Sequence, residues 1–536
     1  MLVVGSPGSG KSKFLEHLIR QDIASSYGLC LLDIHGALYQ DVKRWCAYKY
    51  LLTRKVVLLD PSTGEYVHGF NPFRPRPGID LDVQVAGMVQ ALLRVWGAEN
   101  TNETPTLDRM LRLLFSAMIV RRIPLHEAYR LINVEERDFR ADVIGCLAAE
   151  PIVRSAWQQI QRLKKAGEWR PEVLSTENRL FRLASSKTMC RFMGATDEAS
   201  NIDCLDLMNK GGVLLVNLKE SETLSEENAK AFAALLVNEL FKSAIMFRDR
   251  DKLGADPLPF FLYLDEWQNI ITPDIKKILA QARKFGLLLI LANQDLSQID
   301  EAFSPQLVRT LMTCCQIKAC FGGLNETDAR RMAQEMLVGQ IDLNETKYEV
   351  AATKFRPEYG RDHVYGDSVF TGIGGSSVYT DQFDQALGPL SALRTGRSKN
   401  RGKGKSVANV PIYRPVEFRE PSSVAKFNVE EQLLRWADRF REQRQQECFV
   451  KLPGTPAQSI VVPFVKSPFV YRATVATYER ELARLNQAES AAACERPTTV
   501  NQRPPPDPAA SVASPTGESA KLPKTPIPDN DGEFFH

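Results

Sequence analysis

The first residues of the chain have the types and spacing of a phosphate-binding loop. The stretch "GSPGSGKS", which starts at Gly5, fits the pattern G-x-x-x-x-G-K-[S/T] in full. Its glycines let backbone N–H groups curl around phosphate oxygens, and the helix expected over residues 13–20 adds positive potential at its N-terminus. A chance glycine-rich turn is the alternative, but the apolar strand before the loop favours a nucleotide site. The residues expected to bind the nucleotide are Gly5, Ser6, Pro7, Gly8, Ser9, Gly10, Lys11, Ser12 and Lys13.

Two side chains of this loop have specific expected roles. Lys11 should reach the β- and γ-phosphates, and Ser12 should hold Mg²⁺. The loop alone predicts ATP or GTP. The chain shows no convincing N-K-x-D-type element for reading guanine, so ATP is the expected nucleotide.

Two adjacent acids supply the second half of such a site. The stretch "PFFLYLDEWQNI" is an apolar run that ends in Asp265 and Glu266. Asp265 can hold the Mg²⁺ shell, and Glu266 can orient or deprotonate the attacking water, because phosphoryl transfer depends on positioning and charge stabilisation. Acids at a strand exit also arise by chance, but the phosphate-binding loop makes the catalytic interpretation stronger.

The next apolar run, in "QARKFGLLLILANQ", ends in amides. Asn293 and Gln294 lie where a polar group can reach the γ-phosphate or the attacking water, and an ordinary polar strand exit is the alternative. Arg283 and Lys284 precede the same run on an expected helix. Either is a solvated basic residue or an arginine finger that reaches a neighbouring subunit's nucleotide. Composition and spacing leave both open.

Bulk composition is that of an ordinary globular protein. The chain has 536 residues, 44% of them hydrophobic and 25% charged, and its length suggests two to four domains. The net charge of +3 gives no global argument for nucleic acid, so such a partner would have to meet a local patch. No apolar run is long enough to span a bilayer, and no signal peptide is evident. The ten cysteines are scattered, which favours buried thiols over a metal site and predicts a cytoplasmic location, with peripheral attachment to the inner membrane as an alternative.

Several apolar runs predict an α/β fold with a mostly parallel, doubly wound sheet. The expected strands are Leu2 to Val4, "LCLLDI", "KVVLLD", "VLLVNL", "FFLYLD", "LLLILAN" and "QIKACF". Residues 80–199 show few strand signals and a helical spacing of apolar residues from Leu107 to Met118, which predicts an all-α insertion.

The remaining chain predicts an extension. We expect "VFTGIGGSSVYT" from Val369 and the basic run at residues 394–405 to be flexible, followed by helices around Trp436 and over residues 478–485. The Pro-, Ser- and Thr-rich end should be disordered. The expected domains are the first part of the nucleotide-binding core (1–79), the insertion (80–199), the second part of the core (200–355), the C-terminal extension (356–490) and the tail (491–536).

The order of the motifs resembles a known family. The segments "LVVGSPGSGKSKF", "LLDIHGALY", "FNPF", "ENRLFRL", "GGVLLVNL", "LYLDEWQNI", "ARKFGLLLILANQ" and "FGGLNETDARRMA" resemble the HerA/FtsK branch of P-loop motors, and most closely the TraD/TraG-type coupling ATPases of conjugation and type IV secretion. The resemblance covers residues 1–336 with interruptions. The phosphate-binding loop is generic, whereas the D-x-H-G after the second strand and the ARKFG…Q segment are more specific.

This resemblance implies a RecA-like motor with an all-α insertion that assembles as a homo-hexameric ring and pumps DNA at the expense of ATP. It gives Lys11, Glu266, Gln294 and Arg283 catalytic roles, with Gln294 as the sensing amide and Arg283 as the intersubunit finger. Ser12 and Asp265 match the metal-binding positions. Asp33 and His35 match the D-x-H-G element, for which the sequence gives no role; a histidine at a strand end is more often packed or hydrogen-bonded than catalytic.

The chain departs from the family at two points. Coupling proteins usually carry a membrane anchor and a leading segment before the first strand, whereas this chain starts inside that strand. It is expected to belong to a soluble branch or to be longer in its native form. The "ANQ" stretch also lacks the Thr or His that often stands beside the glutamine in relatives.

The expected function is a DNA-translocating ATPase in conjugative transfer, with DNA held mainly through its phosphates. Candidate contacts are Arg309, Arg330, Arg331 and the 394–405 run, and solvated surface charge is the alternative for each. Type IV secretion or relaxosome proteins are the expected partners. The alternatives are a related ATPase that powers protein secretion or DNA-end processing, and a non-motor, nucleotide-dependent adaptor.

Overall fold

The computed structural model describes most of the chain. The described residues are 1–61, 66–98, 104–163, 166–194, 201–249, 255–269, 281–302, 305–370, 374–384, 388–398, 402–486 and 489–490, with the single residues Leu253 and Leu279. The Pro-rich tail at 491–536, which we expect to be disordered, lies outside them.

A nine-stranded sheet forms the centre of the molecule, in the order β14-β13-β8-β1-β7-β6-β2-β5-β3. The first eight strands of the chain, apart from β4, pair in parallel. Their bounds are β1 (Leu2–Val4), β2 (Gly28–Asp33), β3 (Val56–Leu59), β5 (Val213–Asn217), β6 (Phe260–Asp265), β7 (Leu287–Asn293) and β8 (Lys318–Phe321). All seven strands expected from the apolar runs are confirmed, because strands covered on both faces are apolar throughout.

Helices cover both faces of this sheet. On one face, α1 (Lys11–Ala24) and α2 (Ala37–Lys49) pack on alternate strand residues such as Val3 and Leu31. On the other, α10 (Cys204–Asn209) and α11 (Glu226–Phe247) pack on the residues between them, such as Val4 and Leu32. The doubly wound α/β fold is therefore confirmed, and it brings the carboxyl ends of β1, β7, β6 and β2 to one edge.

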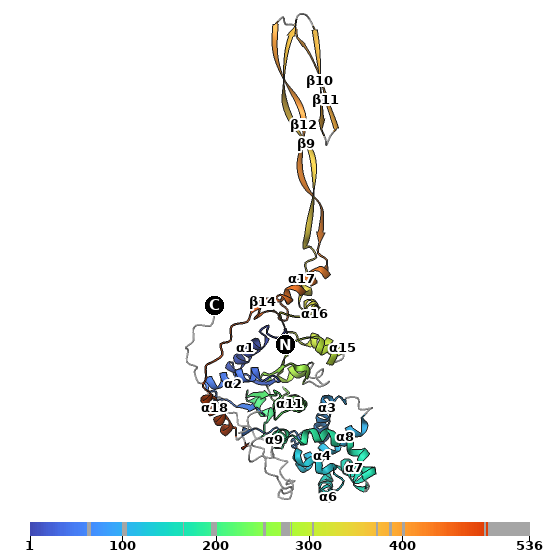
Figure 1. Ribbon diagram of the computed structural model, residues 1–536, viewed down its shortest axis with the longest axis vertical. Coiled ribbons are helices and arrows are strands. Elements are labelled where there is room, and N and C mark those ends of the chain that lie inside the picture. The colour runs from blue at the N-terminus through green and yellow to red at the C-terminus, as the bar shows by residue number, and fades with distance from the viewer. Residues whose placement is uncertain are drawn as a thin grey trace.

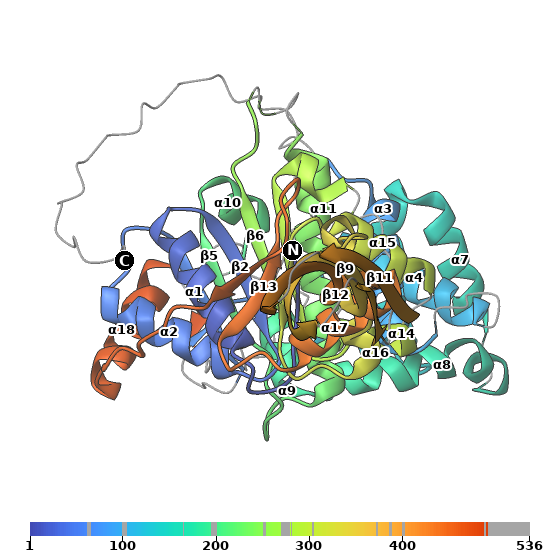
Figure 2. The same ribbon diagram turned by 90° about the horizontal axis from the view of Figure 1, so that it is seen from above.

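Only helices occur in the described residues between 81 and 193. They are α3 (Leu81–Val95), α4 (Pro105–Arg121), η1 (Leu125–Glu127), α5 (Ala128–Ile132), α6 (Arg137–Cys146), η2 (Leu147–Ala149), α7 (Pro151–Arg162), α8 (Ala166–Ala184) and α9 (Lys187–Met193). Helix α3 packs against α11 of the core, and the predicted helix from Leu107 is α4. In the view from above, α4, α7 and α8 lie at the opposite end of the molecule from α2 (Figure 2).

Short elements connect the later strands of the sheet. They are η3 (Trp267–Asn269), η4 (Ala282–Phe285), α14 (Ser297–Ala302), α15 (Pro305–Cys314), α16 (Glu326–Leu337) and η5 (Val338–Gln340). A two-residue pair, β4 (Tyr66–Val67) with β15 (Glu489–Ser490), stands apart from the main sheet. No helix in the described ranges has the length and apolar character needed to cross a membrane.

Where the structure describes them, the segments after the core that we expect to be flexible form strands. Strands β9 (Thr346–Phe370) and β12 (Gly402–Lys426) pair along their length as an antiparallel ribbon that projects from the sheet (Figure 1). Twenty-five residues per strand give it a length of about 80 Å. β10 (Gly374–Asp384) and β11 (Gly388–Ser398) form a second pair, which includes part of the basic run. The prediction weighed glycine and charge above the repeated Val, Tyr, Thr and Phe that favour strands.

The chain then returns to the core, so part of the expected C-terminal extension (356–490) packs on it. α17 (Val429–Arg441) packs on α16, and β13 (Glu447–Lys451) pairs antiparallel with β8. β14 (Gln458–Val461) extends the sheet edge, and α18 (Arg472–Leu485) packs on α2. Both C-terminal helices were predicted, but their place on the core was not. The domain boundaries stay predictions.

Candidate nucleotide-binding site

The predicted phosphate-binding loop follows β1 at the carboxyl edge of the sheet. Gly8 and Gly10 have φ values of 79° and 107°, in the left-handed region where a side chain would be strained. The Ser9 hydroxyl donates to the Ser6 carbonyl at 2.8 Å, which closes the loop on itself. Helix α1 begins at Lys11, so its first backbone N–H groups face the space inside the loop.

Lys11 and Asp265 are the strongest signs of an anionic ligand and its cation. The Lys11 amine and Asp265 Oδ1 are both buried, and neither has a hydrogen-bond partner among the described residues. Burial lowers the pKa of Lys11, against the attraction of Asp265 and Glu266. Burial also raises the pKa of Asp265 to about 6, against the attraction of Lys11. Buried polar groups in proteins are normally paired, so these two atoms are arranged for a ligand.

These orphaned atoms fit a magnesium nucleotide. Asp265 ends β6 with a free carboxylate oxygen, and Ser12 is exposed on the first turn of α1. Carboxylate, hydroxyl and phosphate oxygens are the ligands that Mg²⁺ takes in such sites. The Lys13 amine pairs with Glu16 at 2.8 Å and with Asp41 at 2.7 Å. The expected binding of the nucleotide by Lys13 would therefore use its backbone N–H.

Glu266 lies beside Asp265 and is contacted from two neighbouring strands. Its Oε1 accepts a hydrogen bond from Gln294 Nε2, at the end of β7, and lies 3.0 Å from His35 Nε2, after β2. Burial lowers the pKa of His35, but the Glu266 hydrogen bond and the charges of Glu266, Asp265 and Asp33 raise it overall above its usual value. Sequence reasoning placed Glu266 and Gln294 in one site and gave His35 no role.

The D-x-H-G element is a turn built around a buried carboxylate. Asp33 accepts from the backbone N–H of His35 at 2.9 Å and of Tyr39 at 2.8 Å. Gly36 has φ 78°, and a Cβ there would approach Asn217 Oδ1 to 2.8 Å. The turn therefore requires glycine, and it fixes the backbone from which His35 projects.

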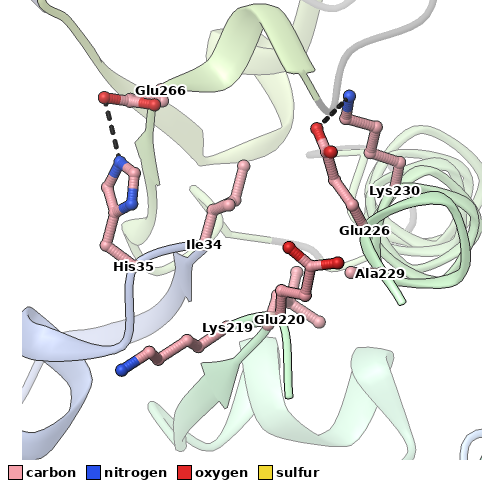
Figure 3. Close-up of a pocket in the computed structure, with 9 residues that line it drawn as sticks. Ile34, His35, Lys219, Glu220, Glu226, Ala229, Lys230 and Glu266 are labelled. Atoms are coloured by element: carbon pink, nitrogen blue, oxygen red, sulfur yellow. Dashed lines mark ion pairs between the residues drawn. The ribbon is translucent and has the colours of Figure 1, made fainter. Parts of the chain in front are cut away.

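A cavity of about 400 Å³ opens beside Glu266. His35 and Glu266 lie on one side of it and face each other, and Glu226 and Lys230 of α11 form an ion pair at 2.6 Å on another (Figure 3). Its lining residues are Ile34, His35, Leu218, Lys219, Glu220, Glu226, Ala229, Lys230 and Glu266. Glu266 therefore borders a cavity formed by residues of its own chain.

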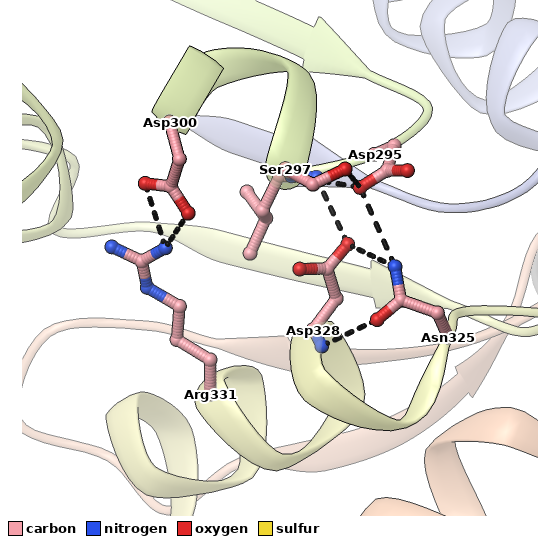
Figure 4. Close-up of polar contacts among 7 residues, drawn as sticks. Asp295, Ser297, Asp300, Asn325, Asp328 and Arg331 are labelled. Carbon is pink, nitrogen blue, oxygen red and sulfur yellow. Dashed lines mark hydrogen bonds and ion pairs between the residues drawn. The ribbon is translucent and has the colours of Figure 1, made fainter. Parts of the chain in front are cut away.

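The loop after Gln294 is held by the "FGGLNETD" segment. Asp328 Oδ2 accepts from the Leu296 N–H and the Asn325 side chain, each at 3.0 Å, and Asp295 accepts from Ser297 at 2.7 Å (Figure 4). Burial and the neighbouring Asp295 raise the pKa of Asp328 to about 6. Sequence reasoning gave Asp328 no function. The only feature of the sequence that could have pointed to it is the N-E-T-D stretch at the start of α16.

The C-terminal part of the chain also holds the phosphate-binding loop. The Gln446 N–H, just before β13, donates to the Ser9 carbonyl at 2.9 Å. The Ser6 hydroxyl donates to the Gly322 carbonyl at 3.0 Å, and the Gly323 N–H donates to the Arg441 carbonyl at 3.1 Å. The loop therefore rests on the turn after β8 and on the segment after α17.

Arg283 lies away from the candidate nucleotide site of its own chain. It lies on η4, exposed, before β7 begins, and donates to Gln316 Oε1 at 3.2 Å. Because β7 is parallel to β1, this end of β7 is at the edge opposite the phosphate-binding loop. Seven residues of strand separate the two edges by about 20 Å.

The candidate DNA contacts differ in their availability. Arg331 is paired with Asp300 at 2.9 Å and Arg330 with Glu326 at 3.3 Å, while Arg309 is exposed on α15. Within the basic run, residues 399–401 lie outside the described part. Of the clustered cysteines expected to be buried, Cys315 and Cys320 are buried and Cys314 is partly buried.

A family model matches one segment of the chain. Residues 259–363 match the family model described as the TraM recognition site of TraD and TraG, which confirms the resemblance to the TraD/TraG type over that segment. No curated protein sequence matches the chain.

The fold is similar to solved coupling-protein structures. The plasmid coupling protein TrwB in complex with ADP and Mg²⁺ has a TM-score of 0.50 and 14% identity, covering 88% of this chain and 87% of that one. TrwB with the non-hydrolysable ATP analogue ADPNP has the same TM-score and identity, with 87% and 86% covered. At this identity the likeness establishes the fold alone.

Proposed function

We propose that this chain is a TraD/TraG-type coupling ATPase: a motor that hydrolyses ATP to move DNA towards a type IV secretion channel during conjugative transfer. The match of residues 259–363 carries the proposal. That segment contains the acidic pair Asp265 and Glu266, the amide Gln294, and the Asp328 network behind it. The structures of TrwB with nucleotide and Mg²⁺ support the choice of ATP and Mg²⁺.

We infer the roles of the site residues from their positions and from the motifs to which they belong. Lys11 would neutralise charge on the β- and γ-phosphates, and the backbone of residues 5–13 would hold the phosphate oxygens. Ser12 and Asp265 would hold Mg²⁺, which when bound offsets the charge that develops on the phosphates. Glu266 would orient the attacking water and take its proton, and Gln294 would sense the γ-phosphate.

The proposal includes a ring and several partners. A homo-hexamer would give each nucleotide an Arg283 from a neighbouring subunit, since Arg283 cannot reach its own site. DNA would be held through its phosphates, with Arg309 as an exposed candidate contact. The family description points to relaxosome proteins as partners. The nine free cysteines of the described part support a cytoplasmic location.

The steady-state ATPase rate, measured with and without single- and double-stranded DNA at low and moderate salt, tests the proposal. A coupling motor should show stimulation by DNA that weakens with salt, because phosphate contacts release counterions. The Lys11→Ala variant is the control for contaminating ATPases. A rate that DNA does not change would contradict the motor proposal and favour an ATPase that powers protein secretion.

A further inference from the structure

The Glu266 carboxylate is held from both sides by residues of the two adjacent strands. In the sheet, β6 lies between β7 and β2. Gln294 follows β7 and His35 follows β2, and both contact the same oxygen, Oε1, of Glu266. Neither His35 nor Gln294 contacts Oε2, so the second carboxylate oxygen is not held by these two residues.

The backbone of Glu266 has an unfavourable conformation, which explains why contacts on both sides hold this residue. Glu266 has φ 52°, one of five non-glycine residues of the described chain in the left-handed region. Such a conformation costs roughly 1–3 kcal/mol and persists only where the surroundings hold it. The Glu266 N–H donates to the Ala292 carbonyl at 2.9 Å, which fixes the chain at the turn. The side chain then depends on His35 and Gln294 for its direction.

His35 is itself supported, but it is not a packing residue. Asp33 and Gly36 fix the turn that carries it, through the hydrogen bond to its N–H at 2.9 Å and the left-handed glycine. Its side chain is 54% exposed and borders the cavity beside Glu266 (Figure 3). Replacing the His35 side chain leaves no buried void, so a His35 variant should fold. The conformation of His35 instead serves its contact with Glu266.

We propose that His35 is a positioning residue for ATP hydrolysis, which aims the Glu266 carboxylate at the attacking water. In that step the water oxygen bonds to the γ-phosphorus, the bond to the bridging oxygen of ADP breaks, and the water proton passes to Glu266. His35 does not touch the nucleotide. The proposal rests on the ATPase activity proposed above and assigns a function to the histidine of the D-x-H-G element.

The test is a comparison of three variants under saturating and limiting ATP. His35→Ala should lower kcat by about 10- to 100-fold, the cost of a misplaced catalytic group, and leave KM and ATP affinity nearly unchanged. His35→Gln should recover much of the loss, because its amide can donate to the same oxygen. His363→Ala, on the exposed surface of the ribbon, is the matched control and should behave as wild type. Melting temperatures should be equal for all three.

A double variant separates positioning from a general structural effect. In a Glu266→Gln background, His35→Ala should cause little further loss, since the group that it positions is already disabled. An unchanged or raised kcat for His35→Ala, failure of His35→Gln to recover activity, or additive losses in the double variant would each overturn the proposal.

A readout without turnover keeps this inference distinct from the proposed function. In nucleotide-free protein, the imidazole ¹⁵N resonances of His35 should shift when Glu266 is changed to Gln, and those of His363 should not. An absent shift would overturn the contact, whatever the ATPase rate. If DNA fails to stimulate the wild type but the His35 effects are present, the motor proposal fails and the positioning role stands.

Discussion

At the scale of single residues, the Lys11 amine is buried without a hydrogen-bond or ion-pair partner in the described part of the chain. A desolvated charge of this kind costs free energy until an anion binds, and burial accordingly lowers the pKa of Lys11. The same residue therefore lowers the stability of the empty protein and, in the proposed function, would bind the nucleotide.

Lys11→Ala should abolish nucleotide binding and raise the melting temperature of the empty protein. Removing an unsatisfied buried group recovers roughly 1–3 kcal/mol. Isothermal titration with ATP and a thermal unfolding scan without it measure the two effects. Normal ATP affinity would contradict the assignment of the loop, and a lower melting temperature would mean that the amine has a partner that stabilises the fold.

His68 should make stability depend on pH. It is 6% exposed, and burial, with the nearby Lys55 charge, lowers its pKa to about 4. The unfolded chain takes up a proton near the usual pKa of about 6.5, while the folded chain does not, so stability is full above that value and falls as the pH drops towards 4. The loss approaches about 3 kcal/mol. Urea unfolding between pH 7 and 4.5 should show a smaller loss for His68→Gln than for wild type; equal losses would contradict this origin.

At the scale of elements, sequence reasoning succeeded where one local pattern decides the structure. The parallel strands are buried on both faces and therefore appear as apolar runs in the sequence. The roles of the phosphate-binding loop and of the Asp265–Glu266 pair, which have motif spacings of their own, stay predictions. The contact of His35 with Glu266 could not be predicted, because it depends on β2 and β6 being neighbours. The return of residues 429–486 to the core depends in the same way on long-range pairing with β8.

The turn after β8 should hold the phosphate-binding loop in the conformation that binds ATP. Gly323 has φ 79°, and a Cβ there would lie 2.1 Å from the Ser6 hydroxyl. Gly454, in the turn between β13 and β14, has φ 74° and open space around it, so it is a matched control for backbone strain. Both alanine variants should lose about 1–2 kcal/mol of stability.

Only Gly323→Ala should also weaken ATP binding, by about 10-fold or more, which corresponds to about 1.4 kcal/mol. Titration with a fluorescent ATP analogue measures this difference. Equal affinities in the two variants would mean that the loop does not depend on the turn that supports it.

At the scale of the whole molecule, the two halves of the proposed catalytic machinery lie on opposite edges of one sheet. The phosphate-binding loop, Glu266 and Gln294 follow the carboxyl ends of their strands, and Arg283 precedes the amino end of β7. A single chain cannot join them across about 20 Å. Head-to-tail assembly in a ring would bring the Arg283 edge of one subunit to the nucleotide edge of the next.

Mixing two inactive variants tests this arrangement. Arg283→Ala alone should bind ATP normally and lose at least about 100-fold in turnover, since a finger contributes about 10³-fold or more. Lys11→Ala subunits bind no nucleotide but retain Arg283, so an equal mixture should recover activity. Half of the sites then have an intact loop and half of their neighbours have the arginine, which gives about a quarter of the wild-type rate. If rings that contain both variants recover nothing, Arg283 does not act across the interface, and its hydrogen bond to Gln316 is then its structural role.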